Sequence, residues 1–219
     1  MIAPGGDRQD ANDEGPPGVS RVEAFSDGVI AIIVTIMVLE LHPPISEGMD
    51  RLVTLWPVFL AYVLSYAYVA IYWVNHHRLF GYATHVSNAL IWANMLLLFA
   101  LSLVPFSTSY LGEHHLNRAA TWLYLATMLV PALAYTWLQA TVRRTGRQGP
   151  NARAYYNAMQ RKSLFALGVY LTGVALTFVS PALGIGCAAL VAVFWVLPSG
   201  PIDRLFADRG GQGPQDRDR

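Results

Sequence analysis

The sequence predicts an all-α integral membrane protein with six transmembrane helices per subunit. Hydrophobic residues make up 54% of the 219 positions and charged residues only 13%, whereas soluble domains average about 25% charged. The apolar residues also gather in long blocks, and about 20 such residues cross the ~30 Å hydrocarbon layer as a helix. A third observation is that basic residues are concentrated in alternate loops.

The first three helices are expected over residues 22–42, 54–76 and 86–110. Each contains a largely apolar block, at 29–41, 55–74 and 89–106 respectively. Residues 42–50, with two prolines and a glycine, separate the first helix from the second, because proline and glycine favour turns over helix interiors. The polar stretch 111–118 ends the third helix.

The last three helices are expected over residues 118–141, 162–179 and 183–199. A basic loop with glycine and proline at 143–153 separates the fourth from the fifth, and a tight connection around Ser180, Pro181 and Gly184 joins the fifth to the sixth. We therefore expect one six-helix domain over residues 21–200.

Both ends of the chain are polar and rich in glycine. Residues 1–20 have no apolar core, so we expect a disordered tail there instead of a signal peptide. Residues 201–219 are expected to be a second disordered tail. Cys187 is the single cysteine, so it has no partner for a disulfide within the chain.

The charge distribution predicts the orientation in the membrane. If the N-terminus is cytoplasmic, only Arg51 and Arg118 lie in outside loops, and the other 13 of the 15 Lys and Arg lie inside. This asymmetry fits the positive-inside rule with both termini cytoplasmic. The net charge of +1 gives no indication of nucleic-acid binding.

Polar residues distinguish the first helix from the other five. Arg21, Glu23, Ser26 and Asp27 lie near its cytoplasmic end and Glu40 near the other. Ionisable groups at membrane depth are unfavourable unless they pair or face water, so they indicate a functional site. The alternative is that Ser26 and Asp27 only cap the helix and match its dipole.

Four residues of the first helix fall on one stripe. Gly28, Ile32, Thr35 and Leu39 are spaced by four, three and four positions, which brings them to one face. Such a stripe suits the wall of a pore. Packing against a neighbouring helix is the more common explanation, because glycine and threonine also permit close helix contacts.

The first two helices also carry a family signature. Arg21-x-x-x-Phe25-Ser26-Asp27, followed by Gly28-Val29-Ile30-Ala31-Ile32, Thr35 and Leu39-Glu40-Leu41, resembles the first helix of the transmembrane protein 175 family in its bacterial, single-repeat form. The resemblance includes the end of the second helix, Trp73-Val74-Asn75-His76-His77-Arg78. Elsewhere between about residues 18 and 200 it rests on hydropathy alone.

This resemblance implies a potassium-selective channel in the bacterial plasma membrane, a homotetramer whose first helices surround the pore. Potassium would be the permeant ion, and no cofactor is implied. By position, Ile32 would form the narrow constriction, Thr35 the next layer outward and Leu39 a further layer. A polar network would fix the first helix against the second, formed by Arg21, Phe25, Ser26, Asp27, Trp73 and His77. The Thr-Val-Gly-Tyr-Gly filter of other potassium channels is absent from such family members and from this sequence.

Physical chemistry fits this interpretation. A ring of Ile32 side chains offers an ion no substitute for its water, so it would gate by dewetting. Thr35 hydroxyls can accept as well as donate and would coordinate a partly dehydrated potassium ion. For Asp27 we favour a structural role, so that Asp27→Ala would impair assembly before it altered selectivity.

Weaker signals remain open. His76-His77 and His114-His115 are adjacent pairs, which point about 100° apart on a helix and seldom bind one metal ion, although His77 suits a pH-sensitive role. The basic segment 143–162 can contact anionic lipid or simply determine topology. Glu40 can form an outer carboxylate ring or pair with a neighbouring helix.

Two other function classes are less favoured. A membrane-embedded enzyme needs catalytic groups that converge at one depth, and beyond the first-helix motif the predicted spans offer only scattered polar residues. A proton-coupled or other secondary transporter is the better alternative, because Asp27, Glu40 and His77 can relay protons. Such carriers often contain broken helices and inverted repeats, and no repeat is apparent here.

Overall fold

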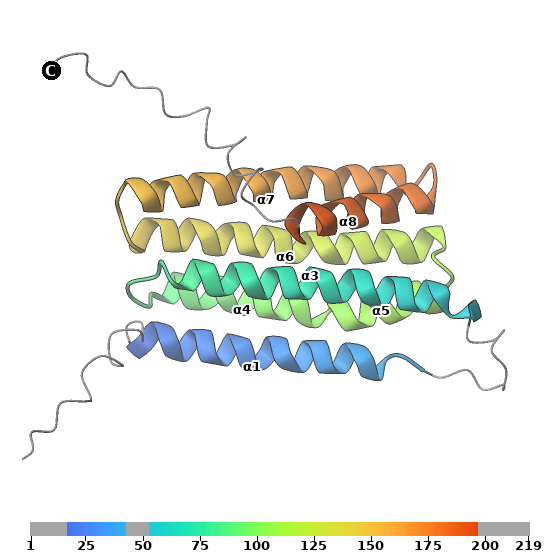
Figure 1. Cartoon of the computed structure of the whole chain (residues 1–219), viewed down its shortest axis with the longest axis horizontal. Helices are drawn as coiled ribbons and strands as arrows, with labels where there is room; N and C mark the ends of the chain where they lie inside the picture. Colours follow the sequence, from blue (N-terminus) through green and yellow to red (C-terminus); the bar gives the residue numbers. More distant parts are fainter. Residues whose placement is uncertain (1–16, 43–52, 197–219) are drawn as a thin grey trace, which may run out of the picture.

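The computed structural model describes residues 17–42 and 53–196, and within these ranges all regular structure is α-helical. The helices lie side by side along one axis, and successive helices alternate in direction except α5, which continues α4 (Figure 1). Their bounds are α1 Pro17–Leu39, α3 Trp56–Phe80, α4 Asn88–Ser102, α5 Val104–Glu113, α6 Arg118–Thr145, α7 Pro150–Leu176 and α8 Pro181–Val196. The predicted all-α fold is therefore confirmed. Of the predicted disordered tails, 1–20 and 201–219, residues 1–16 and 201–219 lie outside the described residues, whereas residues 17–20 belong to α1.

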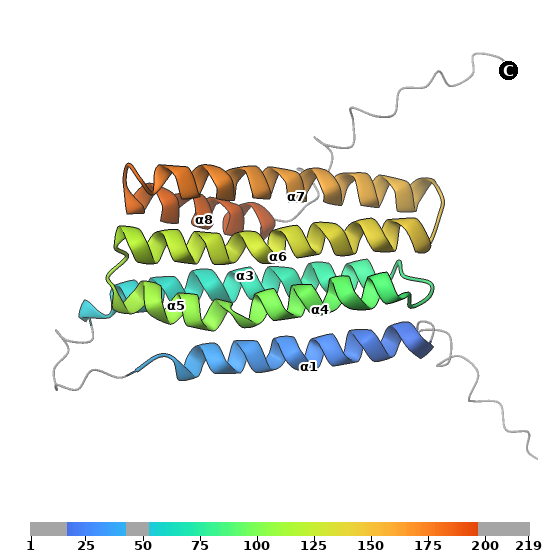
Figure 2. The ribbon, with the colours of Figure 1, turned by 180° about the vertical axis from the view of Figure 1, so that it is seen from behind.

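The helix α1 occupies one edge of the bundle and α7 the opposite edge (Figures 1 and 2). α1 packs against α3, α4 and α5, whereas α6 packs against α4, α5, α7 and α8. The largest fully buried side chains include Leu97 and Leu101 of α4 and Tyr124 and Leu138 of α6. The core thus lies behind α1, which contributes one face to it, while the described helices leave its other face uncovered.

The predicted third helix, 86–110, is divided into α4 and α5 at Leu103. Pro105 has no N–H to donate and its ring clashes with the carbonyl four residues earlier, which interrupts the helical hydrogen bonds. Leu103 N donates instead to Ala100 O at 3.3 Å, in a tighter turn. The apolar character continues across the break, so α4 and α5 together cover the predicted span.

The predicted start of the fifth helix at residue 162 is wrong, because α7 begins at Pro150. Proline suits the first helical turn, where its missing N–H would have no partner. The first half of this helix is too polar for average hydropathy to indicate a span, but the spacing of its apolar residues indicates a helix. Buried residues of α7 recur at spacings of three or four, namely Ala152, Tyr156, Met159, Ser163, Ala166 and Tyr170. Much of the predicted basic loop is therefore an amphipathic helical extension. The first helix likewise begins earlier than predicted, at Pro17.

Four helical stretches are long and apolar enough to cross a membrane: Gly18–Leu39, Trp56–Phe80, Asn88–Glu113 and Arg118–Thr145. The third combines α4 and α5. α7 is not among them, and α8 has only 16 residues. The structure thus supports four spans by length and composition, within the residues that it describes.

Candidate functional site

One face of α1 is not covered by any other described helix of the chain. The side chain of Ile32 is 59% exposed and that of Leu39 is 74% exposed. Gly28 and Thr35 are also exposed, and a Cβ added at Gly28 would meet no atom within 4 Å. The stripe predicted from the spacing therefore exists. Its alternative explanation, packing against another helix, does not hold for the described helices of the same subunit.

The opposite face of α1 is buried in the bundle. Ile30, Ile33 and Met37 are 1–3% exposed and belong to the hydrophobic core. These positions follow the same helical period as the exposed stripe but lie on the other side. The sequence of α1 thus fixes its rotation, with the Ile32 side pointing away from the bundle.

The hydroxyl of Thr35 is oriented by its own helix. Thr35 Oγ1 donates to the backbone carbonyl of Ile32 at 2.8 Å, a bond that threonine often forms in helices. Because the proton points back to the backbone, the oxygen lone pairs are free to face outward from the exposed side of α1. A group in this state acts as an acceptor, which is what a cation requires.

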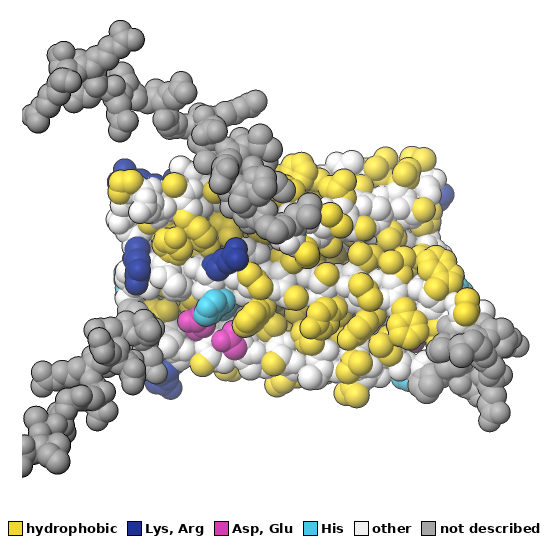
Figure 3. Space-filling model, viewed as in Figure 1, with side chains coloured by type: hydrophobic (Ala, Val, Ile, Leu, Met, Phe, Trp, Pro, Cys, Tyr) yellow, Lys and Arg dark blue, Asp and Glu magenta, His cyan; other side chains and the backbone are white. Residues whose placement is uncertain are grey.

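A first polar cluster joins α1 to α3 at the surface. Trp73 Nε1 donates to Asp27 Oδ1 at 3.0 Å, and the indole stacks on the ring of His77 with centroids 6.1 Å apart. His77 Nδ1 lies 2.8 Å from Glu23 Oε1. Figure 3 shows acidic side chains beside a histidine over this contact between the two helices. The structure therefore brings Asp27, Trp73 and His77 together as expected, and adds Glu23.

A second polar cluster is fully buried behind α1. His76 Nε2 lies 2.8 Å from Asn94 Oδ1, Asn94 Nδ2 donates to Ser26 Oγ at 2.8 Å, and Ser26 Oγ donates to Val22 O at 2.8 Å. The side chains of Ser26, His76 and Asn94 are each 0% exposed. With the amide of Asn94 placed this way, the chain of donors starts at His76 and ends on the backbone of α1. It links three helices, since Ser26 is in α1, His76 in α3 and Asn94 in α4.

Arg21 and Phe25 do not join either cluster within the subunit. Both side chains are exposed, and they line a shallow pocket on the α4 side of α1 together with Val86, Ile91 and Met95. Phe25 and Asp27 differ by two positions, which points them to opposite sides of the helix. Within the described subunit, Glu23 contacts His77 in the first cluster and Asn94 joins His76 to Ser26 in the second.

The adjacent histidines lie in different environments. His76 is buried whereas His77 is exposed, and His114 contacts its own helix through Tyr110 O at 2.9 Å. Among the described residues no group of three or more His, Cys, Asp or Glu has the geometry to hold a metal ion. Glu40 lies at the other end of α1, where it shares a pocket with Glu113.

The Asp27–Trp73 bond permits a direct test of the structural role expected for Asp27. Because Trp73 is 43% exposed, the bond is partly solvated, and Asp27→Ala is expected to lower the free energy of unfolding by only about 1 kcal/mol. The midpoint of thermal unfolding in detergent and the yield of oligomer measure this. Asp27→Asn, which keeps an oxygen acceptor, is the matched control. A changed ion selectivity at normal oligomer yield would contradict the structural role.

Comparisons with known proteins agree with the architecture and the α1 motif. The profile of the family described as "Endosomal/lysosomal potassium channel TMEM175" matches residues 21–105. A potassium channel of a Chryseobacterium species is 40% identical over 189 residues, covering 86% of this chain and 97% of the relative. A potassium channel of Streptomyces collinus is 36% identical, covering 83% of this chain and 93% of the relative.

A solved structure resembles the whole bundle. The crystal structure of a lysosomal potassium-selective channel TMEM175 homolog from Chamaesiphon minutus superposes with a TM-score of 0.74 at 32% identity. The match covers 83% of this chain and 98% of that chain. The similarity therefore extends well beyond the first two helices.

Proposed function

Because this chain belongs to the TMEM175 family, we propose that it is a potassium-selective channel whose pore is lined by the outward face of α1. The observation that carries this proposal is the exposed stripe of Gly28, Ile32, Thr35 and Leu39 on a helix whose other face is fully packed. An apolar residue that the described helices of its own subunit leave uncovered faces either lipid or another copy of the chain. The polar hydroxyl of Thr35 within the same stripe favours a water-filled path over lipid.

A pore of this kind requires several copies of the chain. α1 lies at the edge of the subunit, so one subunit cannot surround an axis with it. We propose a homotetramer in which four α1 helices meet, as the family resemblance implies. Each subunit would then contribute one Ile32, one Thr35 and one Leu39 to successive rings.

In this proposal the Ile32 ring controls gating and the Thr35 ring determines selectivity. Four Ile32 side chains provide no ligand for an ion, so a narrow ring excludes water and stops conduction. When the ring widens, four Thr35 oxygens, whose protons are already donated to the backbone, coordinate the ion. Potassium passes more readily than sodium because it loses its hydration shell at lower free-energy cost.

All six helical units would cross the membrane, with α4 and α5 acting as one. The starts of α1 and α7 and the ends of α3 and α6 lie at one end of the bundle (Figure 1). Basic residues gather there, namely Arg21, Arg78, Arg143, Arg144, Arg147 and Arg153, whereas Arg118 lies at the opposite end. The positive-inside rule makes the first end cytoplasmic, and the membrane would be the bacterial plasma membrane.

Two measurements test the proposal together. The mass of the purified protein in detergent should equal that of four chains, and liposomes containing it should pass potassium passively until the potential reaches the potassium equilibrium value. A saturating flux that depends on a second solute or on a proton gradient would instead indicate a secondary transporter.

Thr35 provides a test of the selectivity mechanism. Thr35→Ala removes the oxygen ligand and is expected to lower the potassium-to-sodium permeability ratio about tenfold, equivalent to about 1.4 kcal/mol of differential barrier. Thr35→Ser keeps the hydroxyl and should preserve the ratio. The ratio is read from reversal potentials in planar bilayers, and an unchanged value for Thr35→Ala would exclude this mechanism.

A further inference from the structure

The helices α6 and α7 carry basic residues but no acidic ones. Between Glu113 and Asp203 the sequence contains no Asp or Glu, whereas six Lys and Arg lie within residues 143–162. The acidic residues Glu23 and Asp27 contact α3, and their helix α1 lies at the opposite edge of the bundle from α7 (Figures 1 and 2). A local excess of positive charge at one end of a membrane protein favours an anionic partner.

Two of these basic residues line a groove between α6 and α7. The groove has a volume of about 310 Å³, and its described lining residues belong to α3, α6 and α7, with none from α8. Arg143 and Arg144, in the last turn of α6, are at one end of it. No Asp or Glu is among the described lining residues. The groove is therefore basic at the end where α6 finishes.

Arg143 is held across the mouth of this groove. Its Nη1 donates to Gln160 Oε1 of α7 at 2.9 Å, which orients the guanidinium between the two helices. A guanidinium has five N–H donors, so several remain for an anion. Arg143 and Arg144 are both exposed, and each planar fork can donate two parallel hydrogen bonds to a phosphate.

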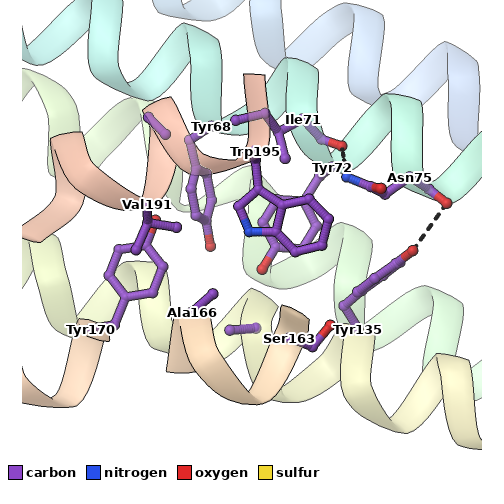
Figure 4. Close-up of a pocket in the computed structure, with 12 residues that line it drawn as sticks. Tyr68, Ile71, Tyr72, Asn75, Tyr135, Ser163, Ala166, Tyr170, Val191 and Trp195 are labelled. Carbon is purple, nitrogen blue, oxygen red and sulfur yellow. Dashed lines mark hydrogen bonds between the residues drawn. The ribbon is translucent and has the colours of Figure 1, made fainter. Parts of the chain in front are cut away.

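The inner wall of the groove is closed. Gln139 lines the groove, and its Nε2 donates to Ser163 Oγ at 2.9 Å. Ser163 in turn lines a cavity inside the bundle, together with Tyr135 and Tyr170 (Figure 4). This cavity has a volume of about 30 Å³, room for roughly one or two water molecules. A larger ligand therefore has to stay in the outer groove.

Apolar side chains extend the groove toward the middle of the bundle. On α6, Leu133 is seven positions from the lining residue Ala140 and so lies on the same face; its side chain is 56% exposed. On α7, Leu167 and Leu171 are seven and eleven positions from Gln160, and Leu171 is 54% exposed. Because α6 and α7 are antiparallel neighbours, these leucines lie in the same direction from the arginines. The surface thus pairs an anion site with a path for a hydrocarbon chain.

The position of the groove in the assembly favours lipid over a soluble anion. The helix α7 lies at the edge of the subunit opposite to α1 (Figures 1 and 2). With α1 around the pore as proposed, α7 faces the surrounding membrane. The arginines are then at headgroup depth, and the leucines are at the depth of the acyl chains.

We propose that this groove binds an acidic phospholipid of the membrane leaflet at the end of the bundle where α7 begins. The phosphate accepts hydrogen bonds from the guanidinium groups of Arg143 and Arg144. One acyl chain lies along Leu133 of α6 and Leu171 of α7. Basic pockets between transmembrane helices recognise acidic headgroups in this way.

Native mass spectrometry of the full chain in mild detergent tests the proposal. Phosphatidylglycerol is expected to form at least about tenfold more one-to-one adduct per subunit than phosphatidylcholine with the same acyl chains, because the two arginines discriminate by charge. The double variant Arg143→Gln/Arg144→Gln should lose this preference. The matched control Arg147→Gln/Arg153→Gln should retain it, since it removes two exposed arginines of the same end that do not line the groove.

A second variant separates the groove from its charge. Ala140→Phe keeps both arginines and fills the groove at an exposed position, so it is expected to reduce phosphatidylglycerol adducts without changing the oligomer mass. Equal binding of the two lipids, equal losses in the two arginine pairs, or full binding by Ala140→Phe would overturn the proposal. So would release of the lipid by millimolar inorganic phosphate, which would indicate a site for free phosphate.

The remaining occupant to distinguish is an acidic side chain of the chain's own C-terminal segment. Asp203→Asn/Asp208→Asn is expected to leave the amount of phosphatidylglycerol adduct unchanged. If the lipid preference appears only in this variant, those carboxylates occupy the groove and the lipid proposal is wrong. The readout is an adduct mass and needs no ion flux, so failure of this proposal is distinguishable from failure of the proposed conduction.

Discussion

Replacement of Asn94 by alanine is expected to destabilise the subunit more than any other single polar substitution discussed here. The change removes the partner of the fully buried His76 Nε2 and the donor to Ser26 Oγ, which still donates to Val22 O. A buried polar group left without a partner costs about 1 to 3 kcal/mol, so the expected loss in free energy of unfolding is about 1 to 3 kcal/mol. An ordinary hydrogen bond between membrane helices averages only about 0.6 kcal/mol. Denaturant titration in detergent, read by circular dichroism, distinguishes the cost of an unpaired buried group from that of one average hydrogen bond.

Asn88→Ala is the matched control for this experiment. Asn88 is at the start of the same helix and is exposed, so its replacement should change the free energy of unfolding by less than about 0.5 kcal/mol. The double variant Ser26→Ala/Asn94→Ala should lose less than the sum of the two single variants, because they share one hydrogen bond. Additive losses would show that the cluster does not act as a unit.

Replacement of Ile32 by serine is expected to have the largest effect on conduction. A ring of hydroxyls is wetted where a ring of branched alkyl groups is not, so the closed pore should leak. Passive potassium flux into liposomes is expected to rise at least about tenfold, the equivalent of lowering the barrier by about 1.4 kcal/mol. Sodium flux should rise by a larger factor, because the wider and wetter ring lets hydrated ions pass.

Val38→Ser is the control for the position of the change around α1. Val38 is also on α1 and is 49% exposed, but six positions at 100° each place it about 120° away from Ile32. Its replacement should leave both fluxes near those of the unmodified protein. Equal increases for Ile32→Ser and Val38→Ser would mean that the stripe does not line the pore.

The features of α1 that are predictable from the sequence are those set by local periodicity. A spacing of four, three and four places Gly28, Ile32, Thr35 and Leu39 on one face of any helix, and the structure leaves that face uncovered. The contact of Asp27 with Trp73 is also expected, although it joins positions 46 residues apart. It follows from the family signature, which includes both residues, and not from spacing.

Other features depend on contacts that a single sequence does not specify. Asn94 is a polar residue within an apolar helix, which indicates a buried polar contact in the sequence alone. Its partners His76 and Ser26 depend on how α4 packs against α3 and α1. The early start of α7 is hidden in the sequence because the low average hydropathy of its first half outweighs the regular spacing of Tyr156, Met159 and Ser163. The exclusion of Arg21 and Phe25 from the network follows from the rotation of α1, which its buried face decides.

The two faces of α1 have an evolutionary consequence. Folding of the subunit depends on Ile30, Ile33 and Met37, whereas the side chains that would meet the ion contribute nothing to that packing. Substitutions on the uncovered side can therefore accumulate without loss of folded protein. The same folded subunit can therefore carry different side chains on that face, and with them a different ion preference.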